Sequence, residues 1–181
     1  MTTRPQNPEG ADEGFAVSPA LGPIPGIYVP LRPPRQTSAR DQHVSIGGTM
    51  TDIPASLRYS NDHLWTRSGT DAGVVRVGVT DFAQQSLGDV VDVTLPNPGD
   101  TIKAGEACGE IESVKSVSDL IAPITGTVRT RNDHLADSPD LVNSDPYGQG
   151  WMFEVEIDQA TLDGQLSALM DASAYGTLVG A

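Results

Sequence analysis

Residues 109–120 constrain the fold more than any other part of the chain. Two short runs, in which apolar and polar residues alternate, flank Lys115, and Pro123 and Gly126 follow them. Alternating runs that are separated by a short polar break and bounded by Gly and Pro are typical of a β-hairpin. The pattern therefore predicts an antiparallel hairpin with Lys115 at or beside its tip.

Lys115 is one of only two lysines in the chain, the other being Lys103. A Schiff-base or general-base lysine must lose its proton, but Glu110, Glu112 and Asp119 are close in sequence and favour the ammonium form. A lysine that another enzyme acylates must instead be exposed and rigidly presented, which a hairpin tip allows. The residues alone leave two interpretations open: a modified lysine and an ordinary exposed turn lysine.

The rest of the chain after residue 49 is a series of short runs divided by Gly and Pro. Residues 74–79 form a β-branched run, and residues 151–157 alternate, with Met152 on the same face as two glutamates. Thr80 can cap a short helix that Gly88 ends. Helical spacing appears only near the C-terminus. We expect a mainly β fold, a small sandwich or flattened barrel with short helices, including C-terminal helices.

Composition limits the classes of partner and of chemistry. The formal net charge is −13, and basic and acidic residues balance before residue 50, so the excess acid lies in residues 50–181. An acidic surface argues against nucleic acid and anionic membranes. The single cysteine, Cys108, excludes an intrachain disulfide and is expected to be a buried, inert thiol. The three histidines show no ligand spacing, so we expect no metal site.

Residues 1–49 differ from the rest, because they contain eight of the 14 prolines. The prolines interrupt the apolar residues too often for a helix, so the sequence predicts a disordered or extended Pro-rich extension. Met50 could be the natural start of the protein, and the rival interpretation is a linker or docking tail. Residues 50–181 form the predicted folded domain.

Several motifs resemble the glycine cleavage system H protein family. Glu-Ser-Val-Lys-Ser at 112–116, with Ser-Asp at 118–119 and Ala-Pro-Ile-Thr-Gly at 122–126, is similar to the lipoyl-attachment region of that family. The likeness covers about residues 57–181 in order. The other segments that carry it are Val-Gly-Val-Thr-Asp-Phe-Ala-Gln at 77–84, Leu-Gly-Asp-Val-Val at 87–91, Leu-Val-Asn-Ser-Asp-Pro-Tyr-Gly-Gln-Gly-Trp at 141–151 and Asp-Ala-Ser-Ala-Tyr at 171–175.

The resemblance implies the lipoyl/biotinyl hammerhead, a flattened antiparallel β barrel-sandwich. It also implies that Lys115 carries one covalent lipoate per chain. Glu112 matches a carboxylate that lipoyl-attaching enzymes favour, and Gly99 and Gly126 match the flanking glycines of the family. We expect these glycines to permit tight turns that fix how the hairpin stands. The flanking Val and Ser residues favour lipoate over biotin, since biotin carriers frame their lysine with methionines.

A second group of residues matches the place where the family shelters its loaded arm. Asp119 matches one position of this arm-docking cleft, and Asp62 is close in sequence to a departure from the family at Leu64. Leu64 departs from the family, because an acidic residue commonly lies between the histidine and the tryptophan there. Leu64 therefore bears on arm docking and leaves arm attachment unaffected.

The resemblance implies a carrier without catalytic residues in the glycine cleavage system. Such a carrier takes an aminomethyl group from glycine decarboxylase (P protein) to the aminomethyltransferase (T protein), and its reduced arm to dihydrolipoyl dehydrogenase (L protein). A lipoate ligase or octanoyltransferase would be a further partner, and we expect a cytoplasmic monomer. The alternatives are a biotin carrier, a lipoate donor to other lipoyl-dependent complexes and a lipoate-free interaction module. An enzyme in its own right has no support, because no nucleophile–base pair or phosphate loop appears.

Overall fold

The computed structural model describes residues 51–181, and the Pro-rich extension and Met50 lie outside the described residues. Strands dominate this part of the chain, as the alternating runs predicted. The strands are β1 (Arg58–Tyr59), β2 (Leu64–Ser68), β3 (Val74–Val79), β4 (Val90–Thr94), β5 (Thr101–Ile102), β6 (Ala107–Ser113), β7 (Val117–Ile121), β8 (Gly126–Arg131) and β9 (Phe153–Glu156). The helices are α1 (Asp81–Leu87), α2 (His134–Asp137), α3 (Leu141–Ser144), α4 (Gln159–Ser167) and α5 (Ala172–Val179).

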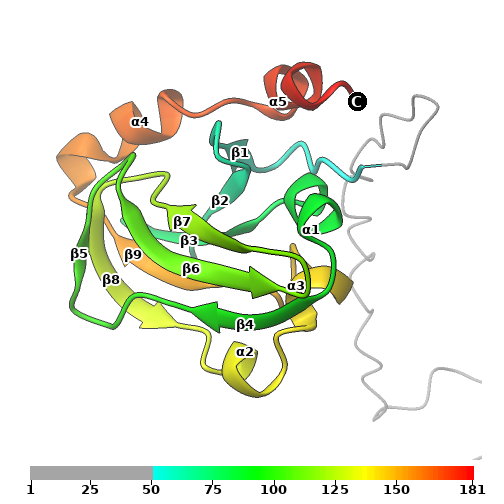
Figure 1. Cartoon of the computed structure of the whole chain (residues 1–181). Coiled ribbons are helices and arrows are strands. Elements are labelled where there is room, and N and C mark those ends of the chain that lie inside the picture. The colour runs from blue at the N-terminus through cyan, green and yellow to red at the C-terminus, as the bar shows by residue number, and fades with distance from the viewer. Residues whose placement is uncertain (1–50) are drawn as a thin grey trace, which may run out of the picture. The chain divides into compact units, whose positions relative to one another are not determined.

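The strands form two antiparallel sheets. The larger sheet has the order β1-β2-β3-β9-β8-β5, and the smaller sheet has the order β4-β6-β7. Figure 1 shows the smaller sheet lying across the larger one, with α4 and α5 following each other along one side. The mainly β, flattened sandwich with short C-terminal helices is therefore confirmed.

The main core lies where the two sheets face each other. Val75, Val77 and Val155 of the larger sheet are fully buried, together with Ile111 and Leu120 of the smaller sheet. Burying a side chain of this size stabilises a fold by about 1.5–3 kcal/mol. This shared core fixes the smaller sheet, and so the β6–β7 hairpin, against the larger sheet.

A second, smaller cluster lies on the other face of β1 and β2. It contains the buried residues Leu57, Tyr59, Trp65 and Tyr175. The rings of Tyr59 and Tyr175 stack with their centroids 4.6 Å apart. Helix α5 is thereby attached to the sheet by an aromatic contact, which places the C-terminal end of the chain beside β1.

One side chain contradicts the sequence pattern. The alternation at 151–157 predicted that Met152 shares the polar face of the strand, but its side chain is fully buried. The strand begins only at Phe153, and the Met152 N–H donates to the carbonyl oxygen of Val77 at 2.8 Å. The period-two rule applies within a strand, so it does not describe the residue that leads into one.

Candidate functional site

The lysine hairpin is present, and its register is defined. Strands β6 and β7 pair antiparallel with Glu112 opposite Val117, so Lys115 lies in the turn between them. The side-chain oxygen of Ser113 accepts hydrogen bonds from the backbone N–H groups of Lys115 and Ser116, at 3.2 and 3.1 Å. The Ser113 N–H donates to the carbonyl oxygen of Ser116 at 2.8 Å. Because the Ser113 side chain is buried at the end of β6, its hydrogen bonds attach the turn to the sheet.

The Lys115 side chain is exposed and lies next to Gly88. Lys115 Nζ is 3.0 Å from the point that a Cβ atom on Gly88 would occupy. Within the described residues, no carboxylate lies within ion-pair distance of this amine. The turn therefore presents a primary amine that a modifying enzyme can reach.

Helix α1 ends directly beside the lysine. Thr80 caps its first turn, since the Thr80 hydroxyl oxygen accepts a hydrogen bond from the Ala83 N–H. Gly88 ends the helix with φ +78° and ψ −157°, a backbone conformation that is essentially confined to glycine. The predicted start and end of this helix are confirmed, and they place the sharp turn at Gly88 against the Lys115 side chain.

A cleft of about 350 Å³ opens between α1 and the lysine hairpin. Apolar residues of α1 and of the two sheets form most of its wall, including Phe82 and Leu87. The sequence-predicted carboxylates Asp62 and Asp119 both line it, although 57 positions separate them in the chain. Leu64 also lines the cleft and is almost fully buried, so it adds an apolar wall.

One titratable residue of the cleft was not singled out as a candidate from the sequence. His63 lines the cleft, and its Nδ1 lies 2.9 Å from the Tyr175 hydroxyl oxygen, which in turn is 2.8 Å from Thr80 Oγ1. Burial lowers the pKa of His63 below its ordinary 6.5, and the nearby charge of Asp62 opposes this shift. Burial also disfavours the charged form of the Tyr175 phenol, and this raises its pKa to about 12. The hydrogen-bond partner of His63, Tyr175, is 112 positions away in the chain, so no local spacing could have indicated this histidine.

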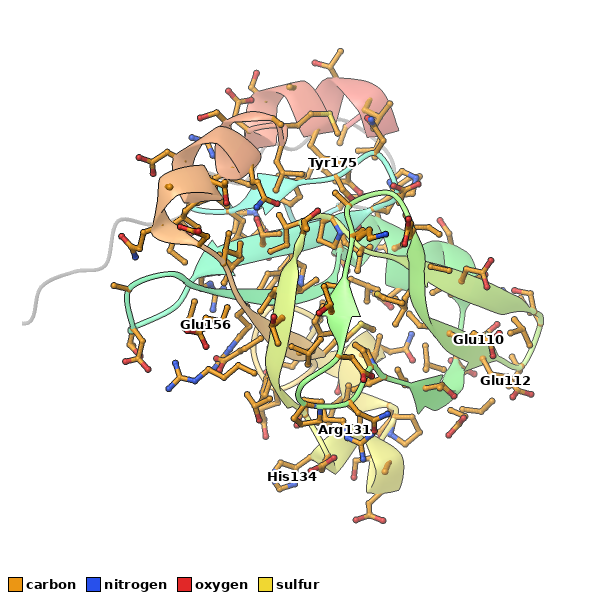
Figure 2. The ribbon with its side chains drawn as sticks, turned by 90° about the vertical axis from the view of Figure 1, so that its left-hand side faces the viewer. Glu110, Glu112, Arg131, His134, Glu156 and Tyr175 are labelled. Atoms are coloured by element: carbon orange, nitrogen blue, oxygen red, sulfur yellow. The ribbon has the colours of Figure 1, made fainter. Side chains whose placement is uncertain are left out.

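The three residues expected to assist recognition lie in different places. Glu112 is exposed on β6 beside the turn, and Figure 2 shows it next to Glu110 at the same edge of the molecule. Gly99 has φ +95° in the turn before β5, and its N–H donates to Val128 of β8. Gly126 begins β8, where a Cβ atom would collide with the backbone of Glu156. The backbone of the larger sheet thus explains why glycine is needed at both positions. Their part in recognition stays a prediction.

Cys108 is half-buried on β6 rather than fully buried as expected. Burial raises the pKa of its thiol to about 11, so it stays protonated and unreactive near neutral pH. Across residues 51–181, no group of three or more His, Cys, Asp or Glu side chains is placed to hold a metal ion. No helix in the same range is long and apolar enough to span a membrane.

The sandwich of two sheets, with an exposed lysine in a tight turn and a cleft beside it, defines the class of hammerhead carrier domains. The family model for the glycine cleavage H-protein matches residues 57–180. The chain belongs to this family. Its members are lipoyl carriers, which serve the glycine cleavage system as carrier subunits and not as catalysts.

Relatives and a solved structure agree with this assignment. The chain is 57% identical over 132 residues to the glycine cleavage system H protein of Mycobacterium avium, covering 71% of this chain and 98% of that protein. It is 51% identical over 131 residues to the protein of the same name from Mycolicibacterium smegmatis, covering 72% and 98%. The crystal structure of a glycine cleavage system H protein from Mycobacterium marinum matches with a TM-score of 0.64 and 41% identity, covering 71% of this chain and all of that chain.

Proposed function

We propose that Lys115 is the attachment point for one lipoate per chain, in amide linkage to Nζ. The observation that carries this proposal is the exposed amine of Lys115, held in a turn that Ser113 fixes from below. A lysine in this setting is a substrate for acylation by another enzyme. The lipoyl group, once attached, supplies a dithiolane that can be reduced and reoxidised.

The residues around the turn suit a lipoyl arm. The cleft beside the hairpin offers apolar walls, which match a hydrocarbon chain, and the carboxylates of Asp62 and Asp119, which match a cationic amine. We infer that these residues shelter the loaded arm. Leu64 keeps the wall apolar at the position where the family commonly has an acid, so the polar contacts depend on the two aspartates.

The same reasoning extends to the partners. We infer that the chain serves glycine decarboxylase, the aminomethyltransferase and dihydrolipoyl dehydrogenase in turn, in the cytoplasm and as a monomer. A lipoate ligase or octanoyltransferase would modify Lys115, with Glu112, Gly99 and Gly126 contributing to recognition. Tethering supports such a relay because a bound group reaches each partner at high effective concentration. The excess of acidic residues would suit partners with basic docking surfaces.

The two lysines of the chain provide a matched test. The full-length protein is co-expressed with a lipoate ligase, and modified peptides are located by mass spectrometry. We expect one lipoyl amide on Lys115, none in Lys115→Arg and unchanged modification in Lys103→Arg, since Lys103 is also exposed but lies outside the hairpin turn. Modification of Lys103, biotin on Lys115 or no modification at all would refute the proposal.

A further inference from the structure

The lysine turn is held by a segment that is distant from it in sequence, residues 88–90. The carbonyl oxygen of Asp89 accepts a hydrogen bond from the N–H of Val114, the residue before Lys115, at 3.0 Å. Val90 pairs with Ser113 in the β4–β6 register. Residues 88–90 therefore contact the turn on the side of β4, and we expect their position to determine the position of the turn.

Asn143 on α3 forms hydrogen bonds with both ends of this segment. Its Nδ2 donates to the carbonyl oxygen of Gly88 at 2.9 Å and to Gln84 Oε1 at 3.1 Å. Its Oδ1 accepts from the Val90 N–H at 2.9 Å. A flipped amide would place a donor against the Val90 N–H and an acceptor against the Gly88 oxygen. Only one orientation of Asn143 therefore satisfies the segment, and the segment is fixed by two bonds to one rigid group.

Gly88 connects these hydrogen bonds to the lysine side chain itself. The Lys115 side chain lies over Gly88, with Cε 3.2 Å and Nζ 3.0 Å from the position of a Cβ atom there. A shift of Gly88 would move the surface on which the lysine rests. Asn143 thus acts on the lysine in two ways, through the backbone of Val114 and through the contact at Gly88.

We propose that Asn143 is a positioning residue for the modification of Lys115. It holds residues 88–90 so that the turn presents the amine in one arrangement to the lipoate-attaching enzyme. This inference rests on the proposed function, because it concerns the same lysine. Removing the amide deletes all three of its hydrogen bonds. We expect kcat/KM for lipoylation to fall about tenfold, which corresponds to about 1.4 kcal/mol in the free energy of presenting the amine.

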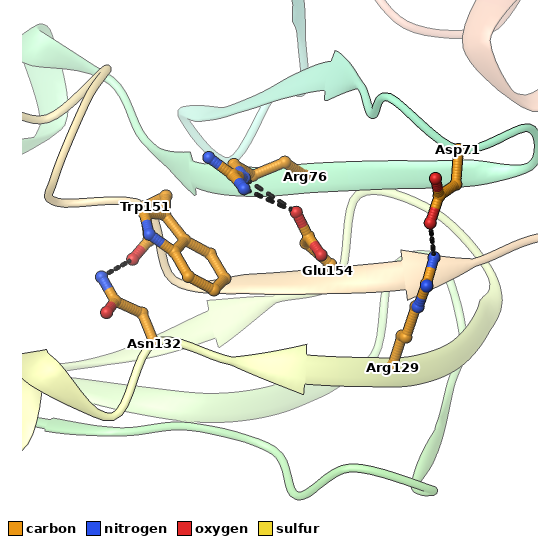
Figure 3. A network of polar contacts seen from close by, with 6 residues as sticks. All are labelled: Asp71, Arg76, Arg129, Asn132, Trp151 and Glu154. Atoms are coloured by element: carbon orange, nitrogen blue, oxygen red, sulfur yellow. Dashed lines mark hydrogen bonds and ion pairs between the residues drawn. The ribbon is translucent and has the colours of Figure 1, made fainter.

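The test compares Asn143→Ala with Asn132→Ala in the full chain. Asn132 is a matched control, because its amide donates to two backbone carbonyls, of Gln149 and Trp151, at 2.8 and 2.7 Å. Figure 3 shows the bond to Trp151, which joins the residue after β8 to the segment before β9 and does not involve residues 88–90. Steady-state lipoylation is measured with a purified lipoate ligase, and hydrogen exchange is followed at the Val114 amide.

We expect Asn143→Ala to show the tenfold loss in kcat/KM together with faster exchange at Val114, while Asn132→Ala shows neither. If Asn143→Ala does not fold, Asn143→Asp replaces it, since it keeps the acceptor for Val90 and loses the donor to Gly88. An unchanged kcat/KM, a loss without faster Val114 exchange, or an equal loss in the folded Asn132 variant overturns the positioning role. Absence of lipoylation in the wild-type chain would instead overturn the proposed function.

Discussion

The turn under Lys115 depends on one buried hydroxyl, and its removal gives a sharp test of that reasoning. Ser113→Ala deletes the acceptor for two backbone N–H groups, of Lys115 and Ser116, and a donor to the Ser116 carbonyl oxygen at 3.1 Å. The freed N–H groups belong to exposed residues, so water can satisfy them. The Ser113 backbone bond to Ser116 remains. We therefore expect a loss of about 1–2 kcal/mol in unfolding free energy, well below the sum of three isolated hydrogen bonds.

Ser116→Ala is the matched control, because it changes the same residue type in the same turn. Ser116 is exposed, and its hydroxyl forms no hydrogen bond with any described residue, so we expect a change within about 0.5 kcal/mol. Urea unfolding gives the free energies, and hydrogen exchange reports on the Lys115 and Ser116 amides. Exchange at these two amides should accelerate about tenfold in Ser113→Ala only. Equal stability and equal exchange in the two variants would show that the hydroxyl does not hold the turn.

Two further predictions concern the surroundings of the lysine. Gly88→Ala and Gly105→Ala both place a side chain at positive φ, +78° and +84°, so each should lose about 1–3 kcal/mol in unfolding free energy. Only Gly88→Ala should also slow lipoylation, because a Cβ at Gly105 meets nothing within 4 Å, whereas one at Gly88 meets Lys115. The His63 imidazole should titrate below 6.5 by NMR, since burial lowers its pKa. As pH falls below 6.5, the unfolded chain binds a proton that the folded chain resists, so stability should decrease; a midpoint at or above 6.5 would contradict this.

Local chemistry explains what the sequence could predict. The lysine hairpin, the Thr80 cap and the stop at Gly88 each depend on residues within a few positions of one another, so their pattern is visible in the chain. The carboxylates Asp62 and Asp119 were found through the family resemblance, and the structure places both on one cleft. Their meeting depends on how strand β7 and the turn before β2 are arranged, which no local pattern specifies.

The remainder could not be predicted because it depends on pairs that are distant in sequence. Asn143 and Gly88 are 55 positions apart, and His63 and Tyr175 are 112 apart. Asn143 lies within the run at 141–151 that resembles the family, but resemblance alone gives a residue no role. The burial of Met152 was missed for a different reason, since the alternation was extended to residues 151 and 152, which precede the strand.

Helix α1 connects the C-terminal third of the chain to Lys115, although the lysine lies outside that third. A helix of seven residues is too short to be stable by itself in water, so its place must come from tertiary contacts. Those contacts arrive from far along the chain: the Tyr175 hydroxyl reaches Thr80 at the start of the helix, and the Tyr147 hydroxyl accepts from the Asp81 N–H at 3.0 Å. Asn143 holds the other end. Because α1 forms one wall of the cleft and its last residue leads into the support of the lysine turn, these contacts fix the cleft and the turn together. Loosening either end of α1 should therefore disturb both, whereas a change confined to β5 or β8 should disturb neither.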